Sequence, residues 1–497
     1  MHVNPAGLGK KLQRARDFME SGNFAEALNL YATLVKHYPQ GGGEYGRAAA
    51  ESGDFALADR IWEKLRKHEP KNADVLSRLA GEYGKVGLHA KSRELFSDAA
   101  AIEPQNRDVQ IKLAWLLART NSVEEARPAV NRCHELDPGS EQARYLSAHL
   151  DRRENKLAEA EKQFRELIAA GPRLAHVRYA CHSELAHILD RTERFDEAIT
   201  VLEEGKNFAR QNFSLKSERK AFYERHESEV RQAVSLPKNI LAAWGKTYPP
   251  RARAMVNPAA FLSGSARSGT TLLERILDAH PAVAACDESL AFKKIQCQVN
   301  LAAPAIPAQR LNVLRQHYVK SLATVLGTAV EGKTLLDKNP SRTIWLPAFL
   351  RVFPELRVLI ALRDPRDVMI SLYFQDHPNT NYLTFEQLAQ HYASVMDVWL
   401  AVREWEGLTW METKYEDIVA DLQKEGSRVT KFLGPEWHEN QGRFYERNRE
   451  KPILSTNYAD VTKPVYKRAV GRWRPYEKQL APALAILEPY CKKFGYE

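Results

Sequence analysis

The sequence predicts a multidomain chain in which an α-helical solenoid precedes an α/β domain built on a parallel sheet. Three observations lead to this prediction. Prolines recur every 34 residues in the first half of the chain, as expected for stacked helical repeats. In the second half, apolar strand-like segments alternate with helical segments, which is typical of a parallel sheet. One apolar segment runs through a glycine turn into a helix, as anion-binding loops do.

The repeat is defined by its prolines and by two positions inside each unit. The prolines 34 residues apart are Pro70, Pro104, Pro138 and Pro172. In each unit a small residue is followed four positions later by a larger one: Ala27 and Tyr31, Ala58 and Trp62, Ser92 and Phe96, Ala126 and Val130, Ala160 and Phe164, Ala198 and Leu202. The small residue lets two helices approach, the larger one fills the gap, and proline ends the second helix. The pattern resembles a tetratricopeptide repeat (TPR) array of about six repeats over residues 8–212.

TPR arrays curve into a groove that usually binds peptides or proteins. The resemblance therefore implies a protein or peptide, as substrate or partner, in that groove. A rigid spacer or a dimerisation element is the alternative, and a homodimer is compatible with either. Residues 213–250 are expected to form a capping helix and a linker, because irregular sequence around Pro249 and Pro250 breaks the helical pattern. The α/β domain is then expected over residues 251–497.

The stretch from Ala259 to Leu277 is predicted to bind an anion. An apolar strand leads into a turn between Gly264 and Gly269, and a helix follows. This order directs backbone N–H groups and the helix dipole at one point. The glycine spacing resembles a Walker loop, but Thr270 stands where that loop carries lysine. A less charged phosphosulfate therefore fits better than a nucleoside triphosphate.

The rest of the second half predicts further strands and helices. Strands are expected over 334–338, 356–362 (a central strand) and 408–413, and helices over 368–374, 385–405 and 416–433. Polar clusters follow three of the apolar segments: Asp287 with Glu288, Lys338 with Asn339, and Arg363 with the residues up to Ser371. Because ligands of parallel sheets gather at the carboxyl ends of the strands, we expect these clusters to share one edge.

Two motifs resemble those of sulfotransferases. The run from Gly264 to Thr271 resembles their 5′-phosphosulfate loop, and the run from Arg363 to Ser371 resembles their 3′-phosphate motif. The resemblance covers residues 259–497 and points to the tyrosylprotein sulfotransferase branch and to TPR-containing bacterial relatives. It implies 3′-phosphoadenosine 5′-phosphosulfate (PAPS) as donor, adenosine 3′,5′-bisphosphate (PAP) as product, a P-loop-like fold, and no metal.

The same resemblance implies roles for individual residues. The 5′-phosphate and sulfonate roles fall on Arg267, Ser268, Gly269, Thr270 and Thr271. The 3′-phosphate roles fall on Arg363 and Ser371, while Tyr415, Ser455, Thr456 and Lys463 match positions that contact adenine or phosphate. Glu288 takes the place of the catalytic base. Lys338 and Arg267 take the place of the groups that stabilise the transferring sulfonate. Asp287 departs from the pattern, because the animal enzymes carry glutamate there.

Composition narrows the choice of partners and compartment. The net charge of +9 suits an anionic cofactor or an acidic substrate. Nucleic acid is not indicated as a partner, because the sequence has no compact run of Lys and Arg interleaved with aromatic residues. The five cysteines are scattered, which fits a reducing compartment rather than a disulfide framework or a zinc site. The sequence has no apolar leader and no long apolar window, so it predicts a soluble, cytoplasmic protein that does not bind a membrane.

The sequence thus predicts a PAPS-dependent sulfotransferase that transfers a sulfonate to a hydroxyl, most plausibly of a tyrosine in a protein or peptide recruited by the TPR groove. Three alternatives stay open. The acceptor could be a carbohydrate or a small molecule. The loop could serve a nucleotide kinase, with Asp364 holding Mg²⁺. The α/β domain could be a nucleotide sensor in a non-catalytic adaptor.

Overall fold

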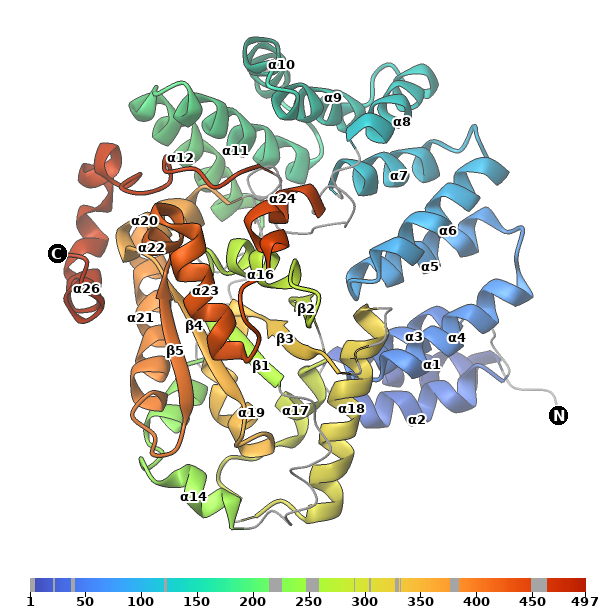
Figure 1. Cartoon of the computed structure of the whole chain (residues 1–497). Helices are drawn as coiled ribbons and strands as arrows, with labels where there is room; N and C mark the ends of the chain where they lie inside the picture. The colour runs from blue at the N-terminus through green and yellow to red at the C-terminus, as the bar shows by residue number, and fades with distance from the viewer. Residues whose placement is uncertain are drawn as a thin grey trace.

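The computed structural model of the chain describes residues 5–20, 23–36, 41–119, 123–213, 226–246, 259–289, 291–303, 305–326, 330, 332–375, 384–447 and 463–497. Its N-terminal part is a helical TPR-like array, and its C-terminal part is built on a parallel sheet (Figure 1). The predicted fold class is therefore confirmed. The array arcs along the C-terminal part: α4 (Phe55–His68) packs on α18 (Ala308–Leu326) near one end, and Glu203 of α12 (Phe195–Asn212) accepts from Tyr373 of α20 (Pro365–Tyr373) near the other.

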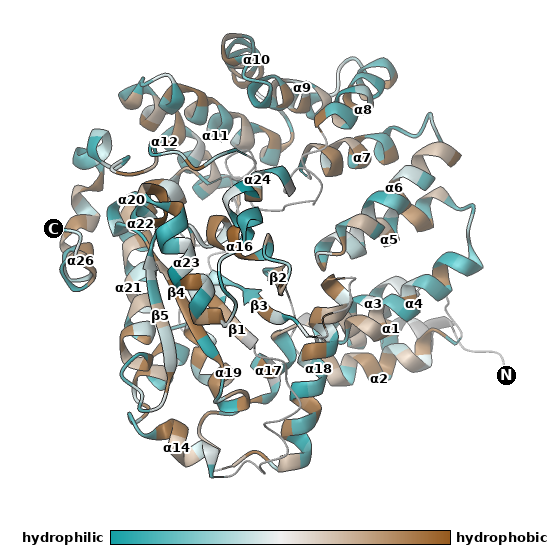
Figure 2. Cartoon of the chain, viewed as in Figure 1, coloured by the Kyte–Doolittle hydropathy of each residue, from teal (hydrophilic) through white to brown (hydrophobic). Residues whose placement is uncertain are grey.

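The array consists of helices that pack in consecutive pairs along the chain. They are α1 (Pro5–Glu20), α2 (Phe24–Leu34), α3 (Gly42–Glu51), α4 (Phe55–His68), α5 (Ala73–Lys85), α6 (His89–Ile102), α7 (Arg107–Arg119), α8 (Val123–Leu136), α9 (Glu141–Arg153), α10 (Leu157–Ala170), α11 (Ala175–Arg191) and α12 (Phe195–Asn212). Hydrophobic and hydrophilic residues alternate along most of them, which fits helices that bury one face (Figure 2).

The repeat positions behave as the sequence predicts. All six small residues and all six larger ones are buried. Each of the four prolines follows the end of a helix by two residues, after α4, α6, α8 and α10. The turns inside the pairs need a left-handed backbone, with φ of 84° at Gly53, 82° at Gly87 and 67° at Asn155. The spacing of the helix pairs and the left-handed residues in their turns therefore both fit the predicted repeat.

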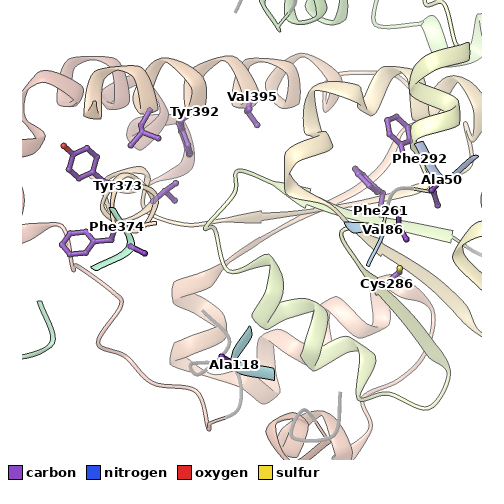
Figure 3. Close-up of a cluster of buried hydrophobic side chains, with 14 of the residues drawn as sticks. Ala50, Val86, Ala118, Phe261, Cys286, Phe292, Tyr373, Phe374, Tyr392 and Val395 are labelled. Atoms are coloured by element: carbon purple, nitrogen blue, oxygen red, sulfur yellow. The ribbon is translucent and has the colours of Figure 1, made fainter. Parts of the chain in front are cut away.

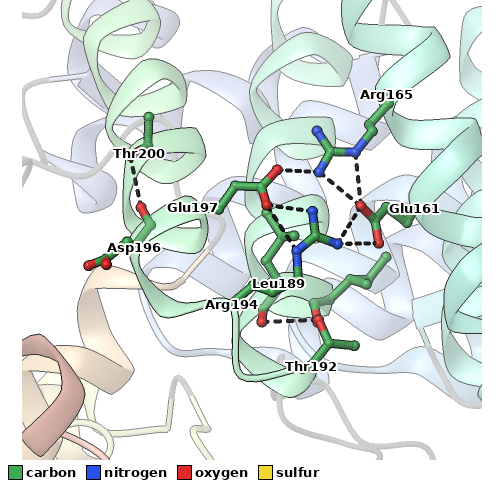
Figure 4. Close-up of polar contacts among 9 residues, drawn as sticks. Glu161, Arg165, Leu189, Thr192, Arg194, Asp196, Glu197 and Thr200 are labelled. Atoms are coloured by element: carbon green, nitrogen blue, oxygen red, sulfur yellow. Dashed lines mark hydrogen bonds and ion pairs between the residues drawn. The ribbon is translucent and has the colours of Figure 1, made fainter.

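Charged side chains also join neighbouring repeats (Figure 4). Arg194 donates to Glu161, at 2.8 Å, and to Glu197, at 2.9 Å. Arg165 donates to the same two carboxylates. Because these side chains are partly exposed, each pair stabilises the fold only weakly, but together they fix the turn before α12 against α10.

The sheet has five parallel strands in the order β2-β3-β1-β4-β5. The strands are β1 (Ala259–Gly264), β2 (Val283–Asp287), β3 (Thr334–Lys338), β4 (Arg357–Leu362) and β5 (Thr409–Lys414). The middle strand is β1, whereas the strand predicted as central, β4, lies beside it. In the register, Gly264 faces Ala361 of β4, and Lys338 faces both Leu262 and Asp287. The strand ends that carry the polar clusters therefore share one edge.

Helices cover the sheet and complete the C-terminal part. They are α14 (Ile240–Gly245), α16 (Thr270–Asp278), α17 (Lys293–Gln298), α18 (Ala308–Leu326), η2 (Pro340–Trp345), α19 (Leu346–Val352), α20 (Pro365–Tyr373), α21 (Phe385–Val402), α22 (Tyr415–Ala420), α23 (Leu422–Leu433), η3 (Glu439–Arg443), α24 (Phe444–Arg447), η4 (Arg474–Tyr476) and α26 (Glu477–Phe494). The single helix predicted over 416–433 is wrong. It is broken at Asp421, which leaves the helical conformation and accepts a hydrogen bond from the Lys424 N–H at 3.0 Å.

The array is attached to the C-terminal part near both of its ends. In the second helix pair, the Gly53 carbonyl accepts from Ser321 Oγ of α18 at 3.0 Å. In the last pair, Asp190 accepts from Tyr476 Oη at 2.7 Å and from Arg472 at 2.9 Å. Figure 3 shows buried residues from both parts: Ala50, Val86 and Ala118 of the array, and Phe261, Cys286 and Phe292 of the sheet region. The two parts therefore share one core.

The segment between the two parts is described from residue 226 to residue 246. His226 packs on His391 of α21, with ring centroids 5.0 Å apart, and Trp244 packs on Trp405 at 5.7 Å. Its expected role as a cap of the array stays a prediction, since residues 214–225 lie outside the described part.

Replacing Asp190 with Ala should destabilise the protein, because Arg472 and Tyr476 would lose their common acceptor at the interface. We expect a loss of about 2 kcal/mol in the free energy of unfolding, measured by urea denaturation. Glu166→Ala, on the exposed surface of α10, is the matched control and should change stability by less than about 0.5 kcal/mol. Equal stability of the two variants would contradict the claim that the Asp190 hydrogen bonds stabilise this interface.

Candidate functional site

The loop between β1 and α16 has the shape expected of an anion-binding turn. Gly264 has a φ of 129°, and a Cβ there would lie 2.3 Å from the Ala361 carbonyl oxygen. Gly269 has a φ of 86°, and a Cβ there would lie 2.6 Å from the Tyr415 ring. Only glycine fits at either position. The chain can therefore turn tightly, and the first N–H groups of α16, which have no acceptor within the helix, stay open to a ligand.

The second motif lies beside this loop, because β4 is the neighbour of β1. Arg363 donates from Nη1 to the Arg267 carbonyl oxygen at 3.2 Å. Arg267 Nε in turn donates to Ser371 Oγ, on α20, at 3.0 Å. The two predicted phosphate-binding motifs, Gly264 to Thr271 and Arg363 to Ser371, are called the two clamps from here on. They are thus in direct contact, at the edge of the sheet where the strands end.

Arg363 is buried, with 6% of its surface exposed. Its Nη2 donates to the Ala469 carbonyl oxygen at 2.5 Å, and its guanidinium lies 4.9 Å from the centre of the Tyr415 ring. Among the described residues its Nε has no hydrogen-bond partner. A buried guanidinium N–H without an acceptor is costly, so this donor suits an anionic ligand such as a phosphate.

Lys338 lies between the first loop and the acidic pair that follows β2. Its side chain is fully buried, and its Nζ pairs with Asp287, with Glu288 Oε1 at 3.0 Å, and with Thr271 Oγ1 at 3.4 Å. Burial opposes its charge, but Asp287 and Glu288 outweigh burial and raise the pKa of the ammonium. Lys338 is therefore cationic and is directed at the point where the loop and Glu288 meet.

Glu288 is the exposed member of this cluster, with half of its side chain accessible. It has a φ of 49°, and its N–H donates to the Lys338 carbonyl oxygen at 2.7 Å. Among the described residues, four that are not glycine have a positive φ, and two of these are Arg267 and Glu288. Strained backbone of this kind gathers at functional sites, where the surrounding structure holds it.

Two buried acids lie beneath the cluster. Burial raises the pKa of Glu274 to about 7 and that of Asp337 to about 7. Glu274 contacts Arg275, which in turn lies 3.6 Å from Asp287. Asp337 accepts from Tyr318 Oη at 2.7 Å and from Ser289 Oγ at 3.4 Å. The Asp337 hydrogen bonds fix the end of β3, and hence the backbone that carries Lys338.

Asp337 should make stability depend on pH. Its pKa is raised from 3.8 to about 7 in the folded protein, so the folded state holds the proton more tightly than the unfolded state. The stability that this group contributes is present below about pH 4 and is lost as pH rises to about 7. Asp337→Asn cannot ionise, and it should be more stable than the wild type at pH 8 by about 2–4 kcal/mol, with no difference at pH 4. Urea unfolding between pH 4 and 8 measures this difference, and a difference independent of pH would contradict it.

The remaining predicted contacts are at the C-terminal side of the site. Tyr415 is buried between Gly269 and Arg363. Lys463 is exposed, and Ser455 and Thr456 lie outside the described residues. The segment that contains Ala469 is anchored by Asp367, which accepts from the Gly471 N–H at 2.8 Å and the Trp473 N–H at 2.9 Å.

Three residues of the site were not predicted as functional. Asp287 pairs with Lys338, although the sequence indicated only a departure from a family pattern. Thr343 donates to the Gly264 carbonyl oxygen at 2.6 Å and supports the turn, and no signal in the sequence marks it. His89, from α6 of the array, is buried near Asp287, whose charge partly opposes the burial that lowers the pKa of the imidazole to about 4. The two residues are far apart in the sequence, so no sequence pattern indicated that they lie close enough to interact electrostatically.

Comparisons with known proteins agree with this geometry. The model of the sulfotransferase family matches residues 258–439, and a tetratricopeptide repeat model matches residues 12–42. The chain is therefore similar to sulfotransferases over residues 258–439. The predicted resemblance to sulfotransferases and to TPR proteins is therefore confirmed.

Individual relatives are distant. An uncharacterized protein of Aquifex aeolicus is 23% identical over 366 residues, which is 68% of this chain but only 45% of that protein. Protein-tyrosine sulfotransferase A of Caenorhabditis elegans is 23% identical over 261 residues, covering 48% of this chain and 68% of that enzyme. The sulfotransferase domain of the Synechococcus PCC 7002 olefin synthase is 20% identical, with a TM-score of 0.35, covering 47% of this chain and 94% of that domain.

Two features are absent from the described residues. No helix among them is long and apolar enough to cross a membrane. In the same part of the chain, no cluster of three or more His, Cys, Asp or Glu side chains could hold a metal ion.

Proposed function

We propose that the sulfotransferase domain uses PAPS as its donor and transfers the sulfonate to a hydroxyl, in particular that of a tyrosine in a protein or peptide. The observation that carries this proposal is the direct contact between the two clamps, through Arg363, Arg267 and Ser371. A nucleotide with phosphates at both its 3′ and 5′ positions suits two adjoining anion sites. The buried Arg363 Nε supports the 3′-phosphate assignment, since that phosphate would supply its missing acceptor.

In this proposal the β1 loop holds the 5′ end of the donor. The backbone and hydroxyls of Ser268, Gly269, Thr270 and Thr271, together with Arg267, bind the 5′-phosphate and the sulfonate. Arg363 and Ser371 bind the 3′-phosphate. Tyr415, and the predicted contacts Ser455, Thr456 and Lys463, would bind the adenine or phosphate groups.

The chemistry follows from the position of Lys338 and Glu288. Sulfuryl transfer resembles phosphoryl transfer, so charge accumulates on the transferring group and on the leaving oxygen. Lys338 and Arg267 stabilise that charge. Glu288 accepts the proton of the acceptor hydroxyl while the new S–O bond forms and the bond to the 5′-phosphate breaks. The products are a sulfate ester and PAP, and no metal takes part.

Labelled donor tests this function. The purified protein would be incubated with ³⁵S-labelled PAPS and a cell extract, and the labelled product would be hydrolysed and identified. We expect label in protein, as sulfotyrosine. Label in carbohydrate or in a small molecule would contradict the tyrosine acceptor, and phosphate transfer from ATP without sulfonate transfer would contradict the donor.

The array and the compartment belong to the same proposal. The repeats support a role in recruiting the acceptor protein, because stacked repeats commonly bind peptides. A cytoplasmic location, which cell fractionation would test, is consistent with the scattered cysteines. A homodimer stays a prediction, for which sedimentation velocity is the test.

A further inference from the structure

The array contains a cavity of about 610 Å³, far along the chain from the sulfotransferase motifs. It is lined mainly by the first helices of the first four pairs, α1, α3, α5 and α7, which follow one another along the array (Figure 1). Leu65 and Phe96 line it from the second helices. It is therefore built from several repeats rather than from one.

Basic side chains dominate the lining. Five cations line the cavity, and only two carboxylates do: Arg16, Arg47, Arg78, Lys85 and Lys112 against Glu44 and Glu82. The two carboxylates are the more buried partners, since the Glu82 side chain is 10% exposed whereas that of Arg47 is 42% exposed. The charge presented to a ligand is therefore positive.

The carboxylates hold the cations in place. Arg47 makes two hydrogen bonds to Glu82, at 2.7 and 2.8 Å, and Lys85 donates to the same side chain at 3.0 Å. A guanidinium has five N–H donors, so this pairing leaves Arg47 able to bind a second acceptor. Within the described part of the chain, Arg78 and Lys112 pair with exposed Asp74 and Asp108, and such surface pairs exchange readily for a ligand carboxylate.

A second observation points independently to a ligand. Ser77 lines the cavity and is 4% exposed, yet among the described residues its Oγ has no hydrogen-bond partner. A buried hydroxyl without a partner is unfavourable, and a polar ligand in the cavity would satisfy it. Space is available as well, because a Cβ on Gly43 or on Gly81 would meet no atom within 4 Å.

We propose that this cavity is a docking site for an acidic peptide segment of another protein, bound through its carboxylates by Arg47, Arg78 and Lys112 and by a hydrogen bond to Ser77. That the docked segment belongs to an acceptor of the sulfotransferase domain rests on the proposed function. Binding of the segment in the cavity does not. The partly exposed Glu44, the buried Glu82 and the single aromatic side chain in the lining fit a peptide better than a nucleic acid, whose continuous phosphates would meet both carboxylates. Docking on the same chain would raise the local concentration of an acceptor at the site.

Fluorescence anisotropy tests the docking site with the full-length protein. The probe is a fluorescein-labelled twelve-residue peptide of alternating Glu and Gly. We expect binding that weakens as NaCl is raised, because the Debye length shortens from about 10 Å at 0.1 M to about 3 Å at 1 M. Arg78→Glu with Lys112→Glu should weaken binding at least about tenfold, which corresponds to a loss of about 1.4 kcal/mol.

Two further variants separate charge from position. Gly81→Leu places a side chain in the cavity without changing charge, and it should also weaken binding at least about fivefold. Arg60→Glu with Lys162→Glu makes the same charge change on exposed positions of α4 and α10 and should leave affinity within about twofold. The docking site would be overturned if Gly81→Leu left the affinity for the peptide unchanged. It would also be overturned if Arg60→Glu with Lys162→Glu lowered that affinity as much as Arg78→Glu with Lys112→Glu.

Two more measurements complete the test. The peptide assignment would be contradicted if a twelve-nucleotide RNA bound as tightly as the peptide and if the same variants abolished binding of that RNA. Affinity for PAP, measured by calorimetry, should be unchanged in every array variant. Wild-type protein that bound the peptide but not PAP would contradict the proposed donor alone, whereas protein that bound PAP but not the peptide would overturn the docking site alone.

Discussion

Glu288→Gln is expected to lower kcat for sulfonate transfer by about 10²–10⁴-fold, the usual contribution of a positioned general base. The amide cannot take the proton of the acceptor hydroxyl, but it has nearly the shape of the carboxylate. It also keeps an oxygen that can accept from Lys338 Nζ, 3.0 Å away in the wild type. Affinity for PAP should therefore stay within about twofold, because the base does not belong to either phosphate clamp. Steady-state kinetics with the acceptor found by ³⁵S labelling, together with calorimetry of PAP, measure the two effects.

The matched control for Glu288 is Glu404→Gln. Glu404 is also a half-exposed carboxylate, 52% accessible, and it pairs with Lys238 at 3.3 Å, far along the chain from the site. It should leave both kcat and PAP affinity unchanged. Turnover by Glu288→Gln within about threefold of the wild type would remove Glu288 from the proposed mechanism.

Arg363→Ala is expected to weaken PAP binding by about 10–100-fold, since hydrogen bonds to a charged group contribute about 1.5–3 kcal/mol each. The effect should be specific to the 3′-phosphate. Adenosine 5′-monophosphate lacks that group and should bind the variant and the wild type about equally. Calorimetric titration of both nucleotides into both proteins gives the four affinities.

Arg357→Ala is the matched control for Arg363. Arg357 is the first residue of β4, the strand that Arg363 directly follows, and it also donates to a backbone carbonyl, that of Leu433. This substitution should leave both affinities unchanged. If Arg363→Ala lost affinity for both nucleotides equally, the substitution would have disturbed the loop in general rather than removed a 3′-phosphate contact.

Much of the fold could be predicted from the sequence because its signals are local. The array follows from a period in which the same small and large residues return, and all of those positions are buried. The strand β1 and its glycine turn follow from an apolar run ended by residues that only a tight turn requires. The break at Asp421 could not be predicted, because the residues on both sides of it favour a helix and only the side-chain hydrogen bond to the Lys424 N–H ends one helix and begins the next.

The site could be predicted in its parts but not in its contacts. Arg267, Arg363 and Ser371 are marked by motifs, but their hydrogen bonds depend on β1 and β4 being neighbours in the sheet. Asp287 and His89 depend on long-range packing, since one pairs with a lysine on β3 and the other comes from the array. Contacts between residues far apart in the sequence carry no local pattern.

A crystal structure of the protein with PAP tests the central claim most directly. We predict one nucleotide, with its 5′-phosphate on the backbone N–H groups of residues 265–271 and its 3′-phosphate within hydrogen-bond distance of Arg363 and Ser371. Nucleotide bound elsewhere, or two separate molecules on the two loops, would contradict the claim that both loops hold one donor.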